Sequence, residues 1–211
     1  YRNIKLLEGT KKEMTVLDPG INKVFYFSVD GSRVEPRRKV VDIEKCNACH
    51  LKLELHGRNR NRPEHCVQCH NPNHTDEARR PKSESPAQTV NFRTMIHRIH
   101  TGKDLKIEFT VYGFGGTPFD FTKIRFPGDR RNCLKCHVEG AYQLPLKDGL
   151  LPSVNPRGYI NPMGPATSAC LGCHTTQAAA AHALGMTNSL GEACTVCHGP
   201  NAEFSVDQVH A

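Results

Sequence analysis

The chain has 211 residues, of which only 37% are hydrophobic and none is tryptophan, so its side chains alone are too few to form a large core. Its formal net charge is +7 at pH 7, but no other feature of the sequence supports binding to nucleic acid. No apolar run approaches the length of a bilayer-spanning helix, which argues against a transmembrane segment in this chain.

Residues 1–42 contain neither cysteine nor histidine, and they are predicted to form a short N-terminal β segment. Side chains alternate from residue 21 to residue 29, and the Asp30-Gly31 pair that follows is a turn signal. Two strands alone are not stable, so we expect this segment to belong to a larger sheet or to pack on the rest of the chain. The start of the chain has no apolar region typical of a signal peptide, so we expect either a removed signal or a longer polypeptide.

From residue 43 onward, cysteine and histidine follow one repeated pattern. All ten cysteines fall in five Cys-x-x-Cys-His units, and none is left over. This spacing is typical of c-type haem attachment, in which both sulfurs bond to the porphyrin and the histidine binds the iron. Zinc sites and disulfides are the alternatives, but neither explains why histidine follows the second cysteine every time. The residues of the units are Cys46, Cys49 and His50; Cys66, Cys69 and His70; Cys133, Cys136 and His137; Cys170, Cys173 and His174; and Cys194, Cys197 and His198.

These units predict five covalently bound c-type haems (haem C) as the cofactors of residues 43–211. They are arranged as two, one and two, with a long insertion, 71–132, before the middle unit. Turn residues predict loops between them, and the helices that we expect are short. The predicted helices cover about 43–56, 90–101, 167–185 and 190–198. The predicted fold is therefore mostly irregular with short α-helices, a multihaem cytochrome c domain with a haem-filled core, and we expect the haem-free chain not to fold.

Function depends on the group that binds each iron on the side opposite the motif histidine. A second histidine closes the iron and favours electron transfer, whereas an open position permits catalysis. Of the 12 histidines, five belong to the motifs and seven are candidates for the sixth ligand. The seven are His56, His65, His74, His97, His100, His182 and His210.

The segment Met95–His100 holds two of these candidates. On a helix, His97 and His100 would differ by about 60° in direction and about 4.5 Å in rise, so each could bind a different iron. We favour two ligands over a pair of surface histidines or one ligand and one spectator. His182 follows His174 by eight residues, about 12 Å along a helix, and is expected to serve a neighbouring haem.

The other candidates differ in their surroundings. His56 follows the first motif by six residues and is expected to cross to a neighbouring haem. For His210, at the C-terminus, the residues leave both ligation and a disordered tail open. We interpret His65, which adjoins Cys66, and His74, in a loop, as contacts with solvent or with haem propionates.

Basic residues form four clusters, which we interpret mainly as partners of haem propionates, because arginine pairs well with carboxylates. A basic face for a mineral surface or for nucleic acid is the alternative. The clusters are Arg37-Arg38-Lys39; Arg58, Arg60 and Arg62; Arg79-Arg80; and Arg130-Arg131.

Several longer segments match a known pattern. They are Cys46-Asn-Ala-Cys-His50 with Leu53-Glu-Leu-His56-Gly57; Cys66-Val-Gln-Cys-His70-Asn71-Pro72; Met95-Ile-His-Arg-Ile-His100-Thr-Gly102; Phe126-Pro-Gly-Asp-Arg-Arg-Asn-Cys133; and Cys194-x-x-Cys-His198-Gly199 with the terminal Val209-His210. On these segments the chain resembles the OmcA/MtrC family of outer-membrane multihaem c-type cytochromes. The double-histidine segment is the most specific of them.

Members of that family usually have ten haems in two pentahaem domains, each preceded by a β-barrel domain. The resemblance therefore implies that residues 43–211 are one pentahaem c-type cytochrome domain, the C-terminal one, and that residues 1–42 are the end of a β-barrel domain. It also implies that the five sixth ligands are His56, His97, His100, His182 and His210. The chain departs from the family in having half the haems and no lipid-anchor cysteine.

We expect an electron carrier rather than an enzyme, passing electrons along five closely spaced bis-histidine haems in extracellular respiration. The expected acceptors are metal oxides, reduced at exposed haem edges, soluble shuttles or other cytochromes. The expected partners are other multihaem cytochromes or an outer-membrane porin-cytochrome complex, at the cell surface or the outer membrane. A soluble periplasmic pentahaem donor to a reductase is the alternative. A multihaem oxyanion reductase is less favoured, because a haem motif ending in lysine, as in pentahaem nitrite reductases, is absent.

Overall fold

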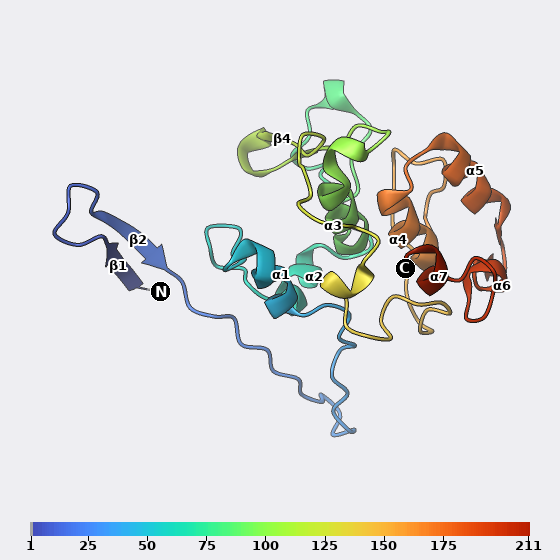
Figure 1. Cartoon of the computed structure of the whole chain (residues 1–211), viewed down its shortest axis with the longest axis horizontal. Coiled ribbons are helices and arrows are strands. Elements are labelled where there is room, and N and C mark those ends of the chain that lie inside the picture. Colours follow the sequence, from blue (N-terminus) through green and yellow to red (C-terminus); the bar gives the residue numbers. More distant parts are fainter. Residues whose placement is uncertain (1) are drawn as a thin grey trace. The chain divides into compact units, whose positions relative to one another are not determined.

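The structure, a computed structural model, describes residues 2–211, which divide into two compact units, one up to Gln68 and one from Cys69 to Ala211 (Figure 1). The boundary between the units falls inside the second Cys-x-x-Cys-His motif. Most of the described chain is irregular, and its helices are short. Its strands form small antiparallel pairs rather than a sheet that could cover a core.

The first unit begins with a hairpin. Strand β1 (Arg2–Leu6) pairs antiparallel with β2 (Met14–Asp18), so that Arg2 lies opposite Asp18. Further on, helix α1 (Ile43–His50) is capped by the Asp42 side chain, which accepts a hydrogen bond from the Glu44 amide, and Pro63 opens helix α2 (Pro63–Cys69). Proline at a helix start costs no hydrogen bond, because the first amides of a helix have no partner within it.

The strand predicted from the alternation at residues 21–29 does not form. This stretch is extended but unpaired, and Phe25, Phe27 and Val29 are 78%, 80% and 93% exposed. A strand needs a neighbour for its backbone hydrogen bonds, and no described strand of the first unit lies beside this stretch. The β structure of residues 2–42 is instead the hairpin at residues 2–18.

Two asparagines hold this extended stretch to the loop before α2. The Asn22 amide donates to the Asn61 side-chain oxygen at 2.8 Å, and the Asn61 amide donates back to the Asn22 side-chain oxygen at 3.0 Å. The Asn61 side chain also donates to the carbonyl of Gly20 at 3.0 Å. These reciprocal bonds satisfy backbone amides that would otherwise have no partner in irregular structure.

The second unit contains three helices of nine or ten residues and several shorter elements. Its helices are α3 (Phe92–Thr101), α4 (Pro165–Cys173), α5 (Gln177–Gly185), α6 (Thr195–His198) and α7 (Val206–Val209). Its strands are β3 (Thr110–Tyr112) with β4 (Pro118–Asp120), and β5 (Thr187–Asn188) with β6 (Gly191–Glu192). Its 3₁₀ turns are Lys82–Glu84, Gly102–Asp104, Phe114–Gly116 and Cys133–Lys135.

The helix predictions hold in position but not always in extent. The helix expected at 167–185 is two helices, because His174 leaves the helical path and Thr176 caps α5 afresh by accepting from the Ala179 amide. The helix expected at 190–198 is confined to α6, after the β5–β6 hairpin. Helices α2 and α7 were not predicted.

A buried ion pair organises the insertion between the second and third motifs. The Arg80 guanidinium contacts the Asp76 carboxylate at 2.8 Å, and both side chains are almost fully buried. Asp76 also accepts from the backbone amides of Gln88 and Tyr112, at 2.7 and 2.9 Å. One carboxylate therefore joins three separate stretches of the insertion.

The apolar core is small. Phe109 and Met163 are fully buried, but the other fully buried side chains of the described residues are threonines and serines. The chain of 23.5 kDa exposes 14165 Å², whereas a folded protein of this mass exposes about 9,800 Å². Exposed side chains near the N-terminus, such as Phe25, Phe27 and Val29, account for part of the excess.

Candidate haem-binding sites

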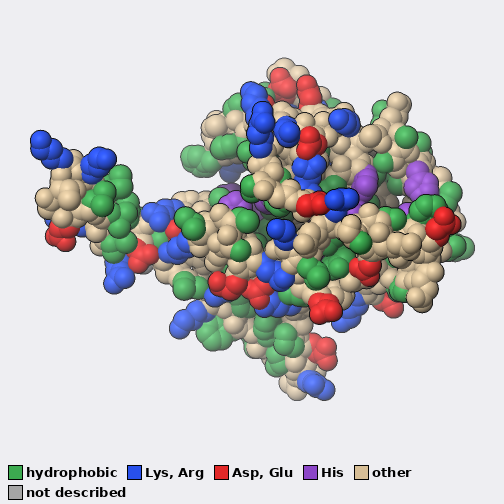
Figure 2. Space-filling view, viewed as in Figure 1, with side chains coloured by type: hydrophobic (Ala, Val, Ile, Leu, Met, Phe, Trp, Pro, Cys, Tyr) green, Lys and Arg blue, Asp and Glu red, His purple; other side chains and the backbone are tan. Residues whose placement is uncertain are grey.

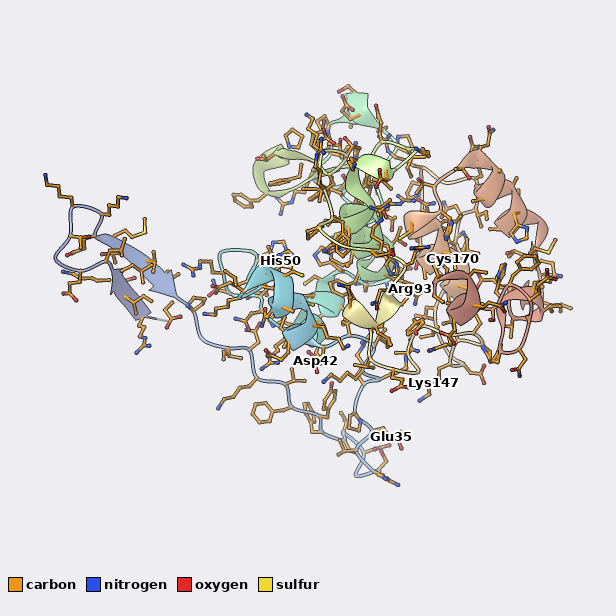
Figure 3. The ribbon with its side chains drawn as sticks, in the orientation of Figure 1. Glu35, Asp42, His50, Arg93, Lys147 and Cys170 are labelled. Carbon is orange, nitrogen blue, oxygen red and sulfur yellow. The ribbon has the colours of Figure 1, made fainter. Side chains whose placement is uncertain are left out.

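Four of the five Cys-x-x-Cys-His motifs lie at the end of a helix. Helix α1 ends at His50, α2 at Cys69, α4 at Cys173 and α6 at His198. Figure 3 labels Asp42 and His50 at the two ends of α1. The remaining motif, the third in chain order (133–137), begins with a 3₁₀ turn. Cysteines three positions apart on a helical turn share one face, so both sulfurs can reach one planar group.

The ten cysteines of the motifs are available for covalent attachment. Each is a free thiol, and each is partly or fully exposed. Although Cys170 is exposed as a residue, the protein atoms around its sulfur reduce its solvation, which raises the thiol pKa to about 11, with a smaller contribution from Cys194. The pKa of the Cys133 thiol is also raised, first by burial and then by the neighbouring Cys173. The third motif thus lies close to the fourth, and the fourth close to the fifth.

Three motif histidines lie opposite histidines that were predicted as sixth ligands. The ring centres are 5.9 Å apart for His97 and His137, 6.0 Å for His174 and His210, and 6.1 Å for His182 and His198. Imidazole nitrogens bind metal ions at about 2 Å, with the ring centre about 1 Å beyond, so two imidazoles on opposite sides of one ion have centres about 6 Å apart. The three pairs match that separation.

Four histidines have one ring nitrogen fixed by a backbone carbonyl. A carbonyl can only accept, so the Nδ1 atoms carry the proton and Nε2 is left with its lone pair, as is usual for a histidine that binds a metal. The bonds are 2.8–2.9 Å long. They join His70 to Val90, His100 to Ile96, His198 to Phe204 and His210 to Val206.

His97 lies in the interior of the second unit. Burial, with a smaller contribution from the neighbouring His137, lowers its pKa to about 4. Burial also lowers the pKa of His174, and the nearby His210 and His198 lower it as well, by smaller amounts. Both shifts favour neutral imidazole, the form that can donate a lone pair to a metal ion.

A fourth pair, His70 and His74, also has ring centres 6.1 Å apart. These two residues are only four positions apart, so local backbone structure brings them together. A turn brings the His74 amide to the Asn71 carbonyl at 3.2 Å, and the Val90 amide donates to the His74 carbonyl at 3.0 Å. Val90 is also the residue that accepts from His70 Nδ1. Local backbone bonds are therefore enough to account for the short distance between these two rings.

The other candidates are placed by their own elements. His56 lies in the turn between the bridged residues Leu55 and Arg60, has a φ of 51°, and is exposed. The Leu53 amide donates to the side chain of Asn47, at 2.8 Å, which links this loop to the first motif. His100 meets the ring of Phe126 edge to face, with centres 5.8 Å apart. His65 lies in α2, directly before Cys66.

Several arginines predicted as propionate partners already contact carboxylates of the protein. Arg58 pairs with Glu54 at 2.8 Å, Arg130 with Asp104 at 2.8 Å and Arg131 with Asp129 at 2.7 Å. Figure 2 shows lysine and arginine side chains scattered over the visible face and histidine side chains reaching the surface. The basic residues do not gather into one patch on that face.

The residues present fit c-type haem. The sulfurs are reachable, the imidazole pairs have the separation that one metal ion requires, and the small core leaves apolar surface that planar groups could cover.

Sequence reasoning did not identify Glu192, whose carboxylate accepts from the amides of Ala166 and Thr167 at 2.8 and 2.6 Å. No spacing in the sequence indicates this contact, because it joins α4 to the distant strand β6.

Comparisons with known proteins give two findings. A family model described as outer membrane cytochrome, MtrC/MtrF-like, domains II/IV, matches residues 38–211. Among solved structures, the chain is similar to the outer membrane decaheme cytochrome OmcA, with a TM-score of 0.50 and 27% identity over 83% of this chain. The similarity covers 24% of the OmcA chain, so this chain spans about a quarter of that relative. No curated protein matches the chain.

Among the described residues, no helix combines the length and the apolar composition that a membrane span requires.

Proposed function

The chain belongs to the outer membrane cytochrome family of MtrC/MtrF-like domains II/IV, and on that premise we propose that it is a pentahaem electron-transfer domain of extracellular respiration. Residues 43–211 carry five haems, one on each Cys-x-x-Cys-His motif, in a haem-filled core. Residues 1–42 are the end of a preceding β-barrel domain. When bound, the haems supply one-electron redox chemistry, and the chain holds them and controls access to their irons.

The observation that carries this proposal is the set of imidazole pairs with centres about 6 Å apart. It supports His97, His182 and His210 as sixth ligands opposite His137, His198 and His174. The Nδ1 bond of His100 to a carbonyl supports a fourth. The family resemblance of the Leu53–Gly57 segment supports His56 as the fifth. With histidine on both sides, each iron is closed to substrates and suited to electron transfer.

The neighbouring motifs support passage of electrons through the second unit. Cys173 of the fourth motif influences the pKa of Cys133 in the third, and Cys194 of the fifth influences that of Cys170 in the fourth, so these motifs are neighbours. Groups held by adjacent motifs would lie close together, which electron transfer requires. The chain is therefore a carrier, and no side chain is assigned a role in acid–base catalysis.

We assign the protein to the outer membrane or cell surface, with other multihaem cytochromes or a porin–cytochrome complex as partners. Metal oxides and soluble shuttles are the proposed acceptors. The family match and the similarity to an outer membrane decaheme cytochrome support this assignment.

The test is haem counting followed by reoxidation. The mass of the chain matured with c-type haem should exceed that of the polypeptide by five porphyrins, and the reduced protein should be reoxidised by ferric oxide. A smaller haem number, or a reduced protein that ferric oxide and soluble shuttles leave unchanged, would contradict the proposal.

A further inference from the structure

Helices α3 and α4 cross in close contact within the second unit. The Thr94 hydroxyl donates to the Ser168 carbonyl at 2.9 Å, and the Arg93 guanidinium donates to the Pro165 carbonyl at 2.9 Å. Thr94 and Ser168 are fully buried. Figure 1 shows the two helices side by side, and Figure 3 labels Arg93 on α3 and Cys170 on α4.

At this crossing, Gly172 touches His97. A Cβ atom added to Gly172 would lie 2.4 Å from the His97 Cβ, 3.2 Å from its Cγ and 3.3 Å from its Nδ1. Real Cβ atoms do not approach other carbons this closely, so any side chain at Gly172 must displace His97. The three atoms nearest to the added Cβ all belong to His97, which makes the contact specific to that residue.

Neither backbone conformation nor haem attachment requires glycine at this position. Gly172 is helical and is not among the residues with positive φ. Glycine weakens a helix relative to alanine, so the helix alone would favour another residue. The equivalent position of the other four motifs holds a side chain each time, namely Ala48, Gln68, Lys135 and Val196. The remaining reason for glycine at position 172 is that a side chain there would occupy the space of His97.

We propose that Gly172 is a positioning residue that keeps His97 opposite His137, so that the fourth motif fixes the sixth ligand of the third haem. The inference rests on the proposed function. Because Gly172 lies between Cys170 and Cys173, the same contact sets how closely the third and fourth haem sites approach. The contact joins α3, which carries the proposed sixth ligand of the middle motif's haem, to the helix that carries the fourth motif.

The experiment compares Gly172→Ala with Gly185→Ala in the haem-loaded protein. Gly185 is also a helical glycine, but an added Cβ there meets nothing within 4 Å. In the reduced state, Gly172→Ala should bind about one carbon monoxide per chain, at the haem that has lost its sixth ligand, and Gly185→Ala should bind none. Equal behaviour of the two variants, with all irons closed, would overturn the inference.

A second variant keeps the test decisive if the Gly172→Ala chain does not fold and acquire its five haems. His97→Gly removes all three atoms that the new Cβ would meet, so the double variant His97→Gly/Gly172→Ala should mature with five haems. Added imidazole should then weaken carbon monoxide binding to the same extent in the double variant and in His97→Gly alone. A double variant that fails to mature, while His97→Gly matures, would show that Gly172 faces something other than His97.

Carbon monoxide binding and haem content of the wild-type protein distinguish a failure of this inference from a failure of the proposed function. Carbon monoxide binding or missing haems in the wild type would contradict the proposed function itself. A closed, five-haem wild type with an unaffected Gly172→Ala variant would contradict only the role of Gly172.

Discussion

The side chain of His210, the proposed sixth ligand at the end of the chain, is held by a single hydrogen bond. Its Nδ1 donates to the Val206 carbonyl at 2.9 Å, which spans one turn of α7 and points Nε2 away from the helix. The centre of the His174 ring lies 6.0 Å from that of His210. A terminal histidine without such a bond would sample many rotamers, and it would bind iron with a larger loss of entropy.

Replacing His210 tests this assignment. In His210→Ala, the haem on His174 should lose its sixth ligand, and the oxidised protein should gain the high-spin absorption of about one haem in five. His74→Ala is the matched control, because the His74 ring centre also lies 6.1 Å from that of a motif histidine but is brought there by local backbone bonds. A high-spin band in His74→Ala and none in His210→Ala would reverse the assignment.

At the scale of elements, helix α4 is held at both ends by residues outside it. Its C-terminal turn packs on α3 through Gly172, and its N-terminal amides are capped by the Glu192 carboxylate from β6. A carboxylate at a helix N-terminus is favourable because it accepts from unpaired amides and faces the positive end of the helix dipole. Glu192 therefore links the helix of the fourth motif to the strand before the fifth.

Removing this cap should weaken the link. Glu192→Ala should lower the free energy of unfolding by about 1–2 kcal/mol, as measured by denaturant titration of the haem-loaded protein. Glu203→Ala, which changes an exposed carboxylate, should leave the unfolding midpoint nearly unchanged. Equal midpoints for the two variants would mean that the Glu192 contacts do not stabilise the helix.

The buried ion pair of the insertion gives a larger expected effect. Asp76→Ala leaves the Arg80 guanidinium buried without its carboxylate and frees two backbone amides, so a loss of about 3–5 kcal/mol is expected. Asp129→Ala is the control, because its pair with Arg131 is solvent-exposed and such pairs contribute little. Denaturant unfolding followed by the absorption of the haems measures both.

Elements that depend on local sequence were predictable, and those that depend on distant partners were not. The spacing of the motifs and the His97–His100 segment located α1 and α3. The alternation at residues 21–29 predicted a strand, but a strand also requires a neighbour, and none of the described strands supplies one. The contacts of Gly172 with His97 and of Glu192 with α4 join residues far apart in sequence, so no local pattern could indicate them.

At the scale of the whole molecule, the polypeptide alone does not bury enough surface to be stable. It exposes 14165 Å² where a folded protein of its mass exposes about 9,800 Å², and its fully buried residues are mostly threonine and serine. Haem attachment and iron ligation would supply the missing burial and crosslinks. We therefore expect folding and haem attachment to be coupled.

A chain with all ten motif cysteines changed to alanine tests this coupling. It should show no cooperative thermal transition by circular dichroism, whereas the haem-loaded chain should show one. A sharp transition in the cysteine-free chain would mean that the side chains suffice to form the fold.

The most direct measurement is electron paramagnetic resonance of the oxidised, haem-loaded chain. If imidazole occupies both faces of each iron, all five haems should give low-spin ferric signals. A high-spin ferric signal that integrates to one haem or more would contradict this account, because it would reveal an iron with an open face.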